Sequence, residues 1–332
     1  MSIATLYHLA DQLFTQAPWD TLEETDLIRI VHPVTGESGY ISIMGAIGQH
    51  YCLTLYIGDE ALRRYNLMQS DDPADPGIPE TDQIGLILET RQLQAAFGPR
   101  SELRKDELAE IKKLGRKYRG ENWPMFRSFK PGCVPGPLDA EGVLWLSTAI
   151  EQFLAVFPTL VPGCTFRLTD GEFEMLTRQR DKGEWHSIWA EHDGRCHEWA
   201  TPAPSEIMIE KVKRHTRLVD IDCHFQLLPA PIGRPESAVY PYLAITAEPK
   251  SGYILGMEML SVEKQSYESL IASVPDVFLR QWEKAGIRPA SIRVSTITSY
   301  SMLEIAAADL NTPMRRATHL AAIDQLMREL PF

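Results

Sequence analysis

Residues 217–229 (RLVDIDCHFQLLP), 239–261 (VYPYLAITAEPKSGYILGMEMLS) and 285–298 (AGIRPASIRVSTIT) decide the fold of this chain. The first two segments are rich in apolar and β-branched residues, which predicts long β-strands. Residues 248–252 (EPKSG) have the composition of a tight turn, so the second segment is expected to fold into a β-hairpin. An amphipathic run separates this hairpin from the strand expected in the third segment.

The C-terminal part as a whole predicts a mixed sheet, in which three long strands are followed by alternating helices and short strands. We expect its three long strands to be contiguous and antiparallel, and the strand at 291–297 to run parallel to the first of them. The expected strands are 218–227, 242–247, 253–259, 291–297 and 314–317, and the expected helices are 205–214, 262–285, 301–310 and 320–330.

The N-terminal part predicts a helix, then an antiparallel meander, then further helices. Gly45 and Gly48 in the connector GAIG are compatible with a nucleotide-binding loop. No GxGxxG pattern follows them, so we favour a hairpin turn. We expect a further strand and a turn in the segment that runs from residues 84–89 to Ser101. The expected helices are 3–14, 59–68 and 105–118, and the expected strands of the meander are 26–31, 39–44 and 51–57.

A core helix at 140–157, with Asp139 as its N-cap, precedes a second meander. The strands of this meander are expected at 165–168, 173–178, 185–191 and 195–199, with tight turns at Asp170-Gly171 and Asp193-Gly194.

The fold class is therefore α+β, and the linker 201–204 (TPAP) separates two domains. We expect an N-terminal domain at 1–204, open to division into subdomains 1–137 and 138–204, and a C-terminal domain at 205–332.

The composition is that of a globular chain: 332 residues, of which 44% are hydrophobic. There is no run of about 18 apolar residues and no signal-peptide pattern, so no membrane association is expected. The five cysteines include no CxxC pair, which argues against a disulfide framework and favours reduced thiols in the cytoplasm. We expect no cofactor.

The net charge of −12 is concentrated in the N-terminal part, where the first 205 residues hold 30 Asp and Glu against 19 Lys and Arg. An acidic surface repels nucleic acid and anionic membranes at long range. This disfavours a nucleic-acid partner, although the near-neutral remainder leaves room for a local basic face. A protein partner or a second copy of the chain fits this balance better.

The stretch from Arg116 to Lys130 interleaves cations with aromatic rings. Guanidinium groups bind phosphates and aromatic rings stack on bases, so the stretch is a candidate contact for an anionic ligand or a single strand. The favoured alternative is a long loop that its aromatic residues pack onto the core. The candidate ligand-binding residues are Arg116, Arg119, Trp123, Arg127 and Lys130.

A zinc site is the second hypothesis that the N-terminal part raises, because His186, His192, Cys196 and His197 fall within twelve residues. Adjacent residues of a strand face opposite sides, so Cys196 and His197 do not point the same way. We therefore favour exposed hairpin residues and expect no metal.

The order of elements in the C-terminal part resembles a ribonuclease H-like core of the integrase and transposase type. VDIDCHFQLLP matches the aspartate-bearing first strand of such cores, YLAITAEPKSGYILG the following hairpin with its Ser-Gly turn, and AGIRPASIRVSTIT the fourth strand with its Gly-x-Pro opening. The resemblance covers about residues 215–330 and implies a ribonuclease H-like mixed α/β domain.

That resemblance also implies acidic residues that hold two metal ions. Asp220 or Asp222 stands at the first acidic position, and Asp324 and Glu329 are candidates for a third. Ser295 and Thr296 occupy the second. Hydroxyl groups are poor ligands for divalent ions beside carboxylates, so the acidic set is degenerate.

The whole chain also resembles an uncharacterised bacterial family of two tandem domains of unknown function, on LYHLA with PWDTL, GYISIMG, KYRGENWPMFRSFKPG and the Tyr-Pro-Tyr strand opening. This resemblance implies a cytoplasmic bacterial protein and assigns no catalytic residue. We expect a non-catalytic binding or scaffold protein. The alternative is a metal-dependent nucleic-acid-processing enzyme of ribonuclease H or integrase type with a displaced ligand set.

Overall fold

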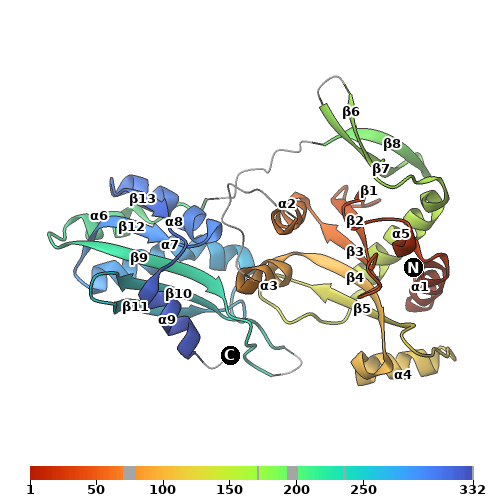
Figure 1. Ribbon diagram of the computed structural model, residues 1–332, viewed down its shortest axis with the longest axis horizontal. Coiled ribbons are helices and arrows are strands. Elements are labelled where there is room, and N and C mark those ends of the chain that lie inside the picture. Colours follow the sequence, from red (N-terminus) through yellow and green to blue (C-terminus); the bar gives the residue numbers. More distant parts are fainter. Residues whose placement is uncertain (70–79, 170–171, 193–200, 235–236, 331–332) are drawn as a thin grey trace. The chain divides into compact units, whose positions relative to one another are not determined.

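The computed structural model describes residues 1–69, 80–169, 172–192, 201–234 and 237–330, and the chain forms two compact units (Figure 1). Unit 1 contains residues 1–69, 90–130 and 135–197, and unit 2 contains residues 70–89, 131–134 and 198–332. The expected α+β class is confirmed, since each unit combines helices with one sheet of mixed orientation.

Within the described residues, unit 1 is built on one eight-stranded sheet with the order β5-β4-β3-β2-β1-β7-β6, and β8 pairs with β7. The strands pair antiparallel except β1 and β7, which are parallel. The strands are β1 (Ile28–Val31), β2 (Ser38–Met44), β3 (Cys52–Ile57), β4 (Gln92–Gly98), β5 (Trp123–Phe129), β6 (Phe166–Thr169), β7 (Glu172–Asp181) and β8 (Glu184–Glu191).

Helices α1 and α5 pack together against one face of this sheet, and the main core of unit 1 lies between the helices and the sheet. Asp139 caps α5 as expected, because its Oδ1 accepts a hydrogen bond of 2.8 Å from the Gly142 amide. A smaller cluster beneath α2 contains Tyr40, Tyr56 and Tyr65. The helices of unit 1 are α1 (Ile3–Gln16), α2 (Asp59–Met68), α4 (Lys105–Lys113) and α5 (Ala140–Val156), with short 3-10 turns η1 (Pro18–Asp20), η2 (Arg100–Glu102) and η3 (Phe157–Thr159).

The expected hairpin at Gly45 and Gly48 is confirmed, since both residues have positive φ between β2 and β3. A Cβ atom on Gly45 would lie 2.6 Å from the Tyr51 ring, so only glycine fits this turn.

The expectation of a packed loop through Arg116 to Lys130 is wrong for its second half, because residues 123–129 form strand β5. Pro124 argues against a strand in a sequence, since proline has no amide hydrogen to donate to a neighbour. β5 is the edge strand of the sheet, where one side of the backbone needs no partner, and proline is tolerated there.

The second meander joins the same sheet through the pairing of β7 with β1. Its hairpin between β7 and β8 turns at Lys182 and Gly183, both with positive φ. The turns proposed at Asp170-Gly171 and Asp193-Gly194 and the strand proposed at 195–199 lie outside the described residues.

In unit 2 the described residues form a five-stranded sheet with the order β11-β10-β9-β12-β13. β9, β10 and β11 are contiguous and antiparallel, and β12 is parallel to β9, so the expected arrangement of the strands is confirmed. Gly252, with a φ of 72°, closes the expected hairpin between β10 and β11. The strands are β9 (Leu218–Leu227), β10 (Tyr242–Glu248), β11 (Tyr253–Leu260), β12 (Arg288–Val294) and β13 (Met314–Arg316).

Helices cover both faces of this sheet. The main core of unit 2 lies under α6, α7 and α8, and Leu88 of α3 packs against it, whereas α9 covers a smaller cluster on the opposite face. Residues 80–89, for which no helix was expected, form α3. The helices are α3 (Glu80–Glu89), α6 (Glu206–Lys213), α7 (Tyr267–Lys284), α8 (Ile297–Asp309) and α9 (Ala321–Glu329).

The fourth strand of unit 2 was expected at 291–297, but β12 ends three residues earlier, at Val294. Thr296 explains the difference, because its Oγ1 accepts a hydrogen bond of 3.0 Å from the Ser299 amide and starts α8. The segment 292–297, which is rich in β-branched residues, therefore contains both the end of a strand and the N-cap of a helix.

One stretch among the described residues, Ala140–Thr159, is long and apolar enough to span a membrane by length and composition. It contains α5, whose residues Leu146, Ile150 and Phe153 are fully buried in unit 1. These contacts make it a core helix of this unit.

We predict that Gly256→Ala destabilises unit 2 by about 1–3 kcal/mol. A Cβ atom on Gly256 would lie 2.7 Å from Cβ and 2.6 Å from Cγ of Gln281, a buried residue held by hydrogen bonds to Thr246 and Ala244. Urea unfolding should show the loss.

The matched control is Gly85→Ala in α3, where an added methyl group meets nothing within 4 Å. It should be neutral or stabilise by up to about 1 kcal/mol. Equal effects of the two substitutions would contradict the close approach of α7 to β11.

Candidate functional site

Strand β9 presents a row of polar side chains on one face of the unit 2 sheet. Val219, Ile221 and Cys223 point into the main core, so the residues between them face the other side. That other face carries Asp220, Asp222, His224 and Gln226, and the neighbouring β12 contributes Ser291 and Arg293.

Asp222 lies at the centre of this row and is ion-paired with Arg293. The guanidinium donates from Nε to Oδ1 at 2.7 Å and from Nη2 to Oδ2 at 2.8 Å, so both carboxylate oxygens are bound. The Asp222 side chain is 1% exposed and the Arg293 side chain 28% exposed. The hydrogen bonds to Asp222 raise the pKa of Arg293 above its ordinary value. The guanidinium therefore neutralises a buried carboxylate in bidentate geometry.

Asp220 is the more exposed of the two aspartates and also has partners. Ser291 Oγ donates a hydrogen bond of 2.8 Å to its Oδ1, and Lys250 Nζ lies 3.5 Å from its Oδ2. The hydrogen bond from Ser291, with a smaller contribution from Lys250, lowers the pKa of the carboxyl group.

The two hydroxyl residues after β12 have structural contacts. Ser295 Oγ lies 2.8 Å from Nδ1 of His224, whose Nε2 lies 2.7 Å from Oε1 of Gln226. Thr296 caps α8. Both hydroxyl groups are thus engaged inside the unit.

Asp324, the third acidic candidate, is in α9 and stabilises the start of that helix. Its Oδ2 accepts a hydrogen bond of 3.1 Å from the Leu320 amide and lies 3.7 Å from Nδ1 of His319.

These contacts test whether the acidic residues suit divalent ions. A two-metal site needs several carboxylates with free oxygens aimed at one point. Asp222 has both oxygens bound to Arg293, and among the described residues no group of three or more His, Cys, Asp or Glu side chains is arranged to hold a metal. The residues present do not fit a two-metal centre.

The zinc hypothesis is tested only in part. His186 is exposed on β8, and the ring of His192 lies 6.1 Å from that of Tyr40. Cys196 and His197 lie outside the described residues, so the expected absence of a metal stays a prediction.

Three cations of the basic and aromatic stretch of unit 1 are paired with carboxylates. Arg116 is ion-paired with Asp11 and Arg127 with Glu107, and Lys130 Nζ lies 3.2 Å from Asp139. Of the candidate residues, Trp123 packs against Tyr118 at 5.7 Å between ring centroids, and Arg119 is exposed. Binding of an anionic ligand here stays a prediction.

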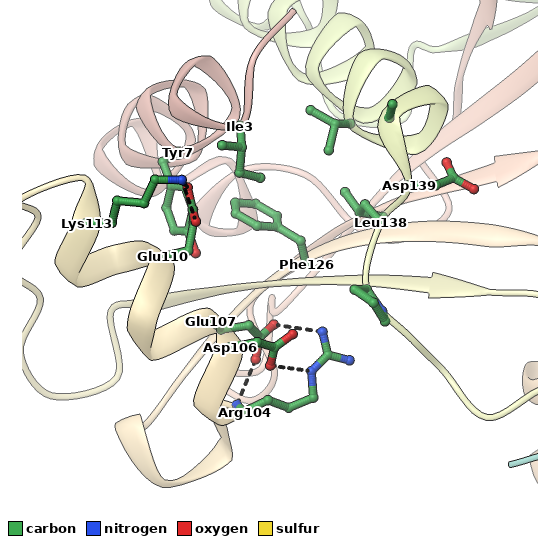
Figure 2. A pocket seen from close by; sticks show the side chains of 13 residues that line it. Ile3, Tyr7, Arg104, Asp106, Glu107, Glu110, Lys113, Phe126, Leu138 and Asp139 are labelled. Carbon is green, nitrogen blue, oxygen red and sulfur yellow. Dashed lines mark hydrogen bonds and ion pairs between the residues drawn. The ribbon is translucent and has the colours of Figure 1, made fainter. Parts of the chain in front are cut away.

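Two of those carboxylates, Glu107 and Asp139, also line a groove of about 460 Å³ in unit 1 (Figure 2). The groove lies between α1, α4, β5 and the start of α5. Its apolar surface includes the rings of Tyr7 and Phe126, which meet edge to face at 5.0 Å between centroids. Its other apolar residues are Ile3, Pro137, Leu138, Ala140 and Val143.

The charged wall of the groove is formed mainly by α4. Arg104 Nε lies 3.3 Å from Oδ1 of Asp106, and Lys113 Nζ lies 3.4 Å from both oxygens of Glu110. Glu107 accepts a hydrogen bond of 2.8 Å from the Arg104 amide and pairs with Arg127. The groove therefore combines an apolar floor with one charged wall.

Comparison with known proteins places both sites in recognised domains. Residues 4–178 match the model of a family described as Domain of unknown function (DUF7309), which covers more than half of the chain. The chain belongs to this family. Residues 208–331 match a second model, described as Domain of unknown function (DUF6930). The expected tandem of two domains of unknown function is confirmed. A search of curated proteins found no match.

Sequence reasoning singled out the polar residues of β9, which lie in the DUF6930 region, but missed the groove in the DUF7309 region. Asp106, Glu110 and Lys113 look like the solvated face of an amphipathic helix. The signal was the neighbouring Arg116 to Lys130 stretch, whose partners Glu107 and Asp139 line the groove.

We predict that Arg293→Met destabilises unit 2 by about 3–5 kcal/mol, because it leaves the buried Asp222 carboxylate without a counterion. Adding Asp222→Leu should recover part of the loss. Urea unfolding followed by tryptophan fluorescence measures both effects.

Arg280→Met is the matched control, since its ion pair with Glu258 is exposed and 3.5 Å long. It should cost less than about 1 kcal/mol. If Arg293→Met were as mild as this control, the Asp222 carboxylate would not depend on Arg293.

We also predict that Asp139→Ala costs about 1 kcal/mol near neutral pH through loss of the N-cap of α5. The Gly142 amide and then Lys130 lower the pKa of Asp139, so its stabilising effect is complete above the ordinary carboxyl pKa and is lost as pH falls through the lowered value. The difference in thermal midpoint between wild type and Asp139→Ala should therefore shrink below about pH 4. A difference that stays constant with pH would contradict this role.

Proposed function

We propose that this chain is a non-catalytic binding or scaffold protein of the bacterial cytoplasm, and that unit 2 is a ribonuclease H-like domain without cleavage activity. The observation that carries the proposal is the bidentate ion pair between Asp222 and Arg293. A fixed guanidinium stands beside the carboxylate where the resembling enzymes need metal ions.

The strand arrangement supports the ribonuclease H-like assignment. Numbered along the chain, the five strands of unit 2 have the spatial order 3-2-1-4-5, in which the first three are antiparallel and the last two run parallel to the first. This agrees with the resemblance drawn from the residues of β9 and the β10–β11 hairpin. Fold alone does not assign an activity, so the argument about function rests on the side chains.

The side chains of the acidic positions support a non-catalytic role. Arg293 neutralises Asp222, Asp220 accepts a hydrogen bond from Ser291 beside an exposed Lys250, and Asp324 accepts a hydrogen bond from the Leu320 amide. Removing a cation such as Arg293 is expected to destabilise the fold, so these contacts cannot be exchanged freely for metal ions.

The surface of unit 2 suits a protein partner or a second copy of the chain better than it suits nucleic acid. β11 is the edge strand of the sheet and exposes Tyr253, Met257 and Met259 to 69%, 56% and 59%. Exposed apolar side chains on an unpaired edge are typical of contacts with another polypeptide. Phosphate contacts are made by hydrogen-bond donors such as Arg and Lys, and the side chains of Met257 and Met259 offer none.

The test is incubation of the purified full-length chain with labelled single- and double-stranded DNA and RNA in the presence of Mg²⁺ or Mn²⁺. We predict no cleavage above a buffer control. Asp220→Asn, which changes a half-buried residue, and Asp309→Asn, which changes an exposed aspartate of α8 outside the polar row, serve as matched variants.

Cleavage that is lost in Asp220→Asn or Asp222→Asn and kept in Asp309→Asn would contradict the proposal. That result would favour a metal-dependent nucleic-acid-processing enzyme with a displaced ligand set.

A further inference from the structure

Glu110 and Asp106 are the two weakly neutralised carboxylates of the unit 1 groove, and Glu110 is the more buried of them, with its side chain 28% exposed against 63%. Glu107 and Asp139 are also paired with Arg127 and Lys130, which come from beside the groove. Glu110 pairs with Lys113 at 3.4 Å, and the Lys113 side chain is 74% exposed. The lining residues comprise four carboxylates (Asp106, Glu107, Glu110 and Asp139) and two cations (Arg104 and Lys113).

An exposed lysine at this distance is held weakly, because surface ion pairs contribute at most about 1 kcal/mol. Lys113 can therefore turn into solvent at small cost. Glu110 is then free to accept another cation inside the groove.

Tyr7 supplies a second observation that points to a ligand. Its side chain lies in the groove and is 2% exposed, yet among the described residues its hydroxyl group has no hydrogen-bond partner. Figure 2 shows Tyr7 reaching from α1 toward Glu110 of α4. Burial raises the pKa of Tyr7, and the negative charges of Glu107 and Glu110 raise it further, so the hydroxyl stays protonated.

Within the described part of the chain the Tyr7 hydroxyl has no protein partner and still reaches solvent at the groove, so a polar group of a ligand can replace water on it. Arg116 lies 5.8 Å from the centroid of the Tyr7 ring and occupies one of its faces, so the Tyr7 hydroxyl and Glu110 are the groups that remain for a cation in the groove. An anion would meet the carboxylates of α4 and be repelled.

We propose that the groove binds a small organic cation, namely an ammonium group on an apolar alkyl or aryl chain. Glu110 and the Tyr7 hydroxyl contact the ammonium group, and Phe126, Leu138 and Val143 contact the chain. The volume of about 460 Å³ lies within the range of small-molecule sites. The site belongs to unit 1, so it stands whether or not unit 2 cleaves nucleic acid.

The probes are three molecules of similar shape that differ in charge: 2-phenylethylammonium, 2-phenylethanol and 3-phenylpropanoate. Isothermal titration calorimetry of the full-length chain, near neutral pH and at low salt, measures their affinities. The ammonium compound should bind at least about tenfold more tightly than the alcohol, the size of one charge-assisted hydrogen bond. The carboxylate should not bind.

Two variants with opposite expected effects test the residues. Glu110→Gln should weaken binding of the ammonium compound about tenfold and leave the alcohol unchanged. Lys113→Gln should strengthen binding of the ammonium compound by about two- to fivefold, because it removes the cation that competes for Glu110.

Lys112→Gln is the matched control, since Lys112 is a neighbouring exposed lysine of α4 that does not line the groove. It changes the net charge by the same amount and should leave binding unchanged. Circular dichroism and thermal midpoints check that each variant is folded, and if Glu110→Gln does not fold, the gain in Lys113→Gln still tests the site.

Three results would overturn the proposal: no binding of the ammonium compound at millimolar concentration, equal binding of all three probes, or equal effects of Lys113→Gln and Lys112→Gln. Each concerns unit 1 alone and leaves the absence of nuclease activity in unit 2 to its own test.

Discussion

Strand β9 is the central strand of the unit 2 sheet, and its position constrains the rest of that unit. One face of the strand must be apolar, because α7 and α8 cover it, and Ile221, Cys223 and Phe225 meet this need. The opposite face carries Asp222, which is fully buried. A buried carboxylate is stable only with a counterion, so β12 must bring Arg293 alongside it. The parallel register of β9 and β12, in which Asp222 is the Cα partner of Arg293, meets this requirement.

The same demand for neutralisation arranges the candidate site of unit 1. Arg116, Arg127 and Lys130 form a basic stretch in the sequence, but each pairs with a carboxylate from another part of the unit. These pairs hold α4 and the start of α5 in place around the groove. Glu110 and Tyr7 remain as polar groups there with little compensation. These three cations therefore have structural partners, and the groove beside them is where we propose that a ligand binds.

Much of the fold could be predicted because the local patterns are strong. The alternation in Leu218–Leu227, the turn at Gly252 and the N-cap Asp139 each act over a few residues, and the structure has all three as expected. The misjudged elements depend on distant residues. β5 contains Pro124 and forms a strand only because it lies at the edge of the sheet. α3 was not anticipated, and the residue that ties it to the unit 2 core, Leu88, has its partners far along the chain.

The sequence by itself determined the α+β class, the three antiparallel strands of unit 2, the parallel placement of the fourth strand, and the tandem of two domains that the family models confirm. Periodicity and turn chemistry suffice for the individual strands and turns, since these depend on neighbours in the chain. The arrangement of the strands and the tandem of domains are what the resemblances to known families imply. Only the tertiary structure decided that Arg293 binds both oxygens of Asp222 and that Tyr7, Glu110 and Phe126 line one groove. Asp222 and Arg293 are 71 positions apart, and Tyr7 is 103 positions from Glu110, so no local pattern records which side chain will meet which charge.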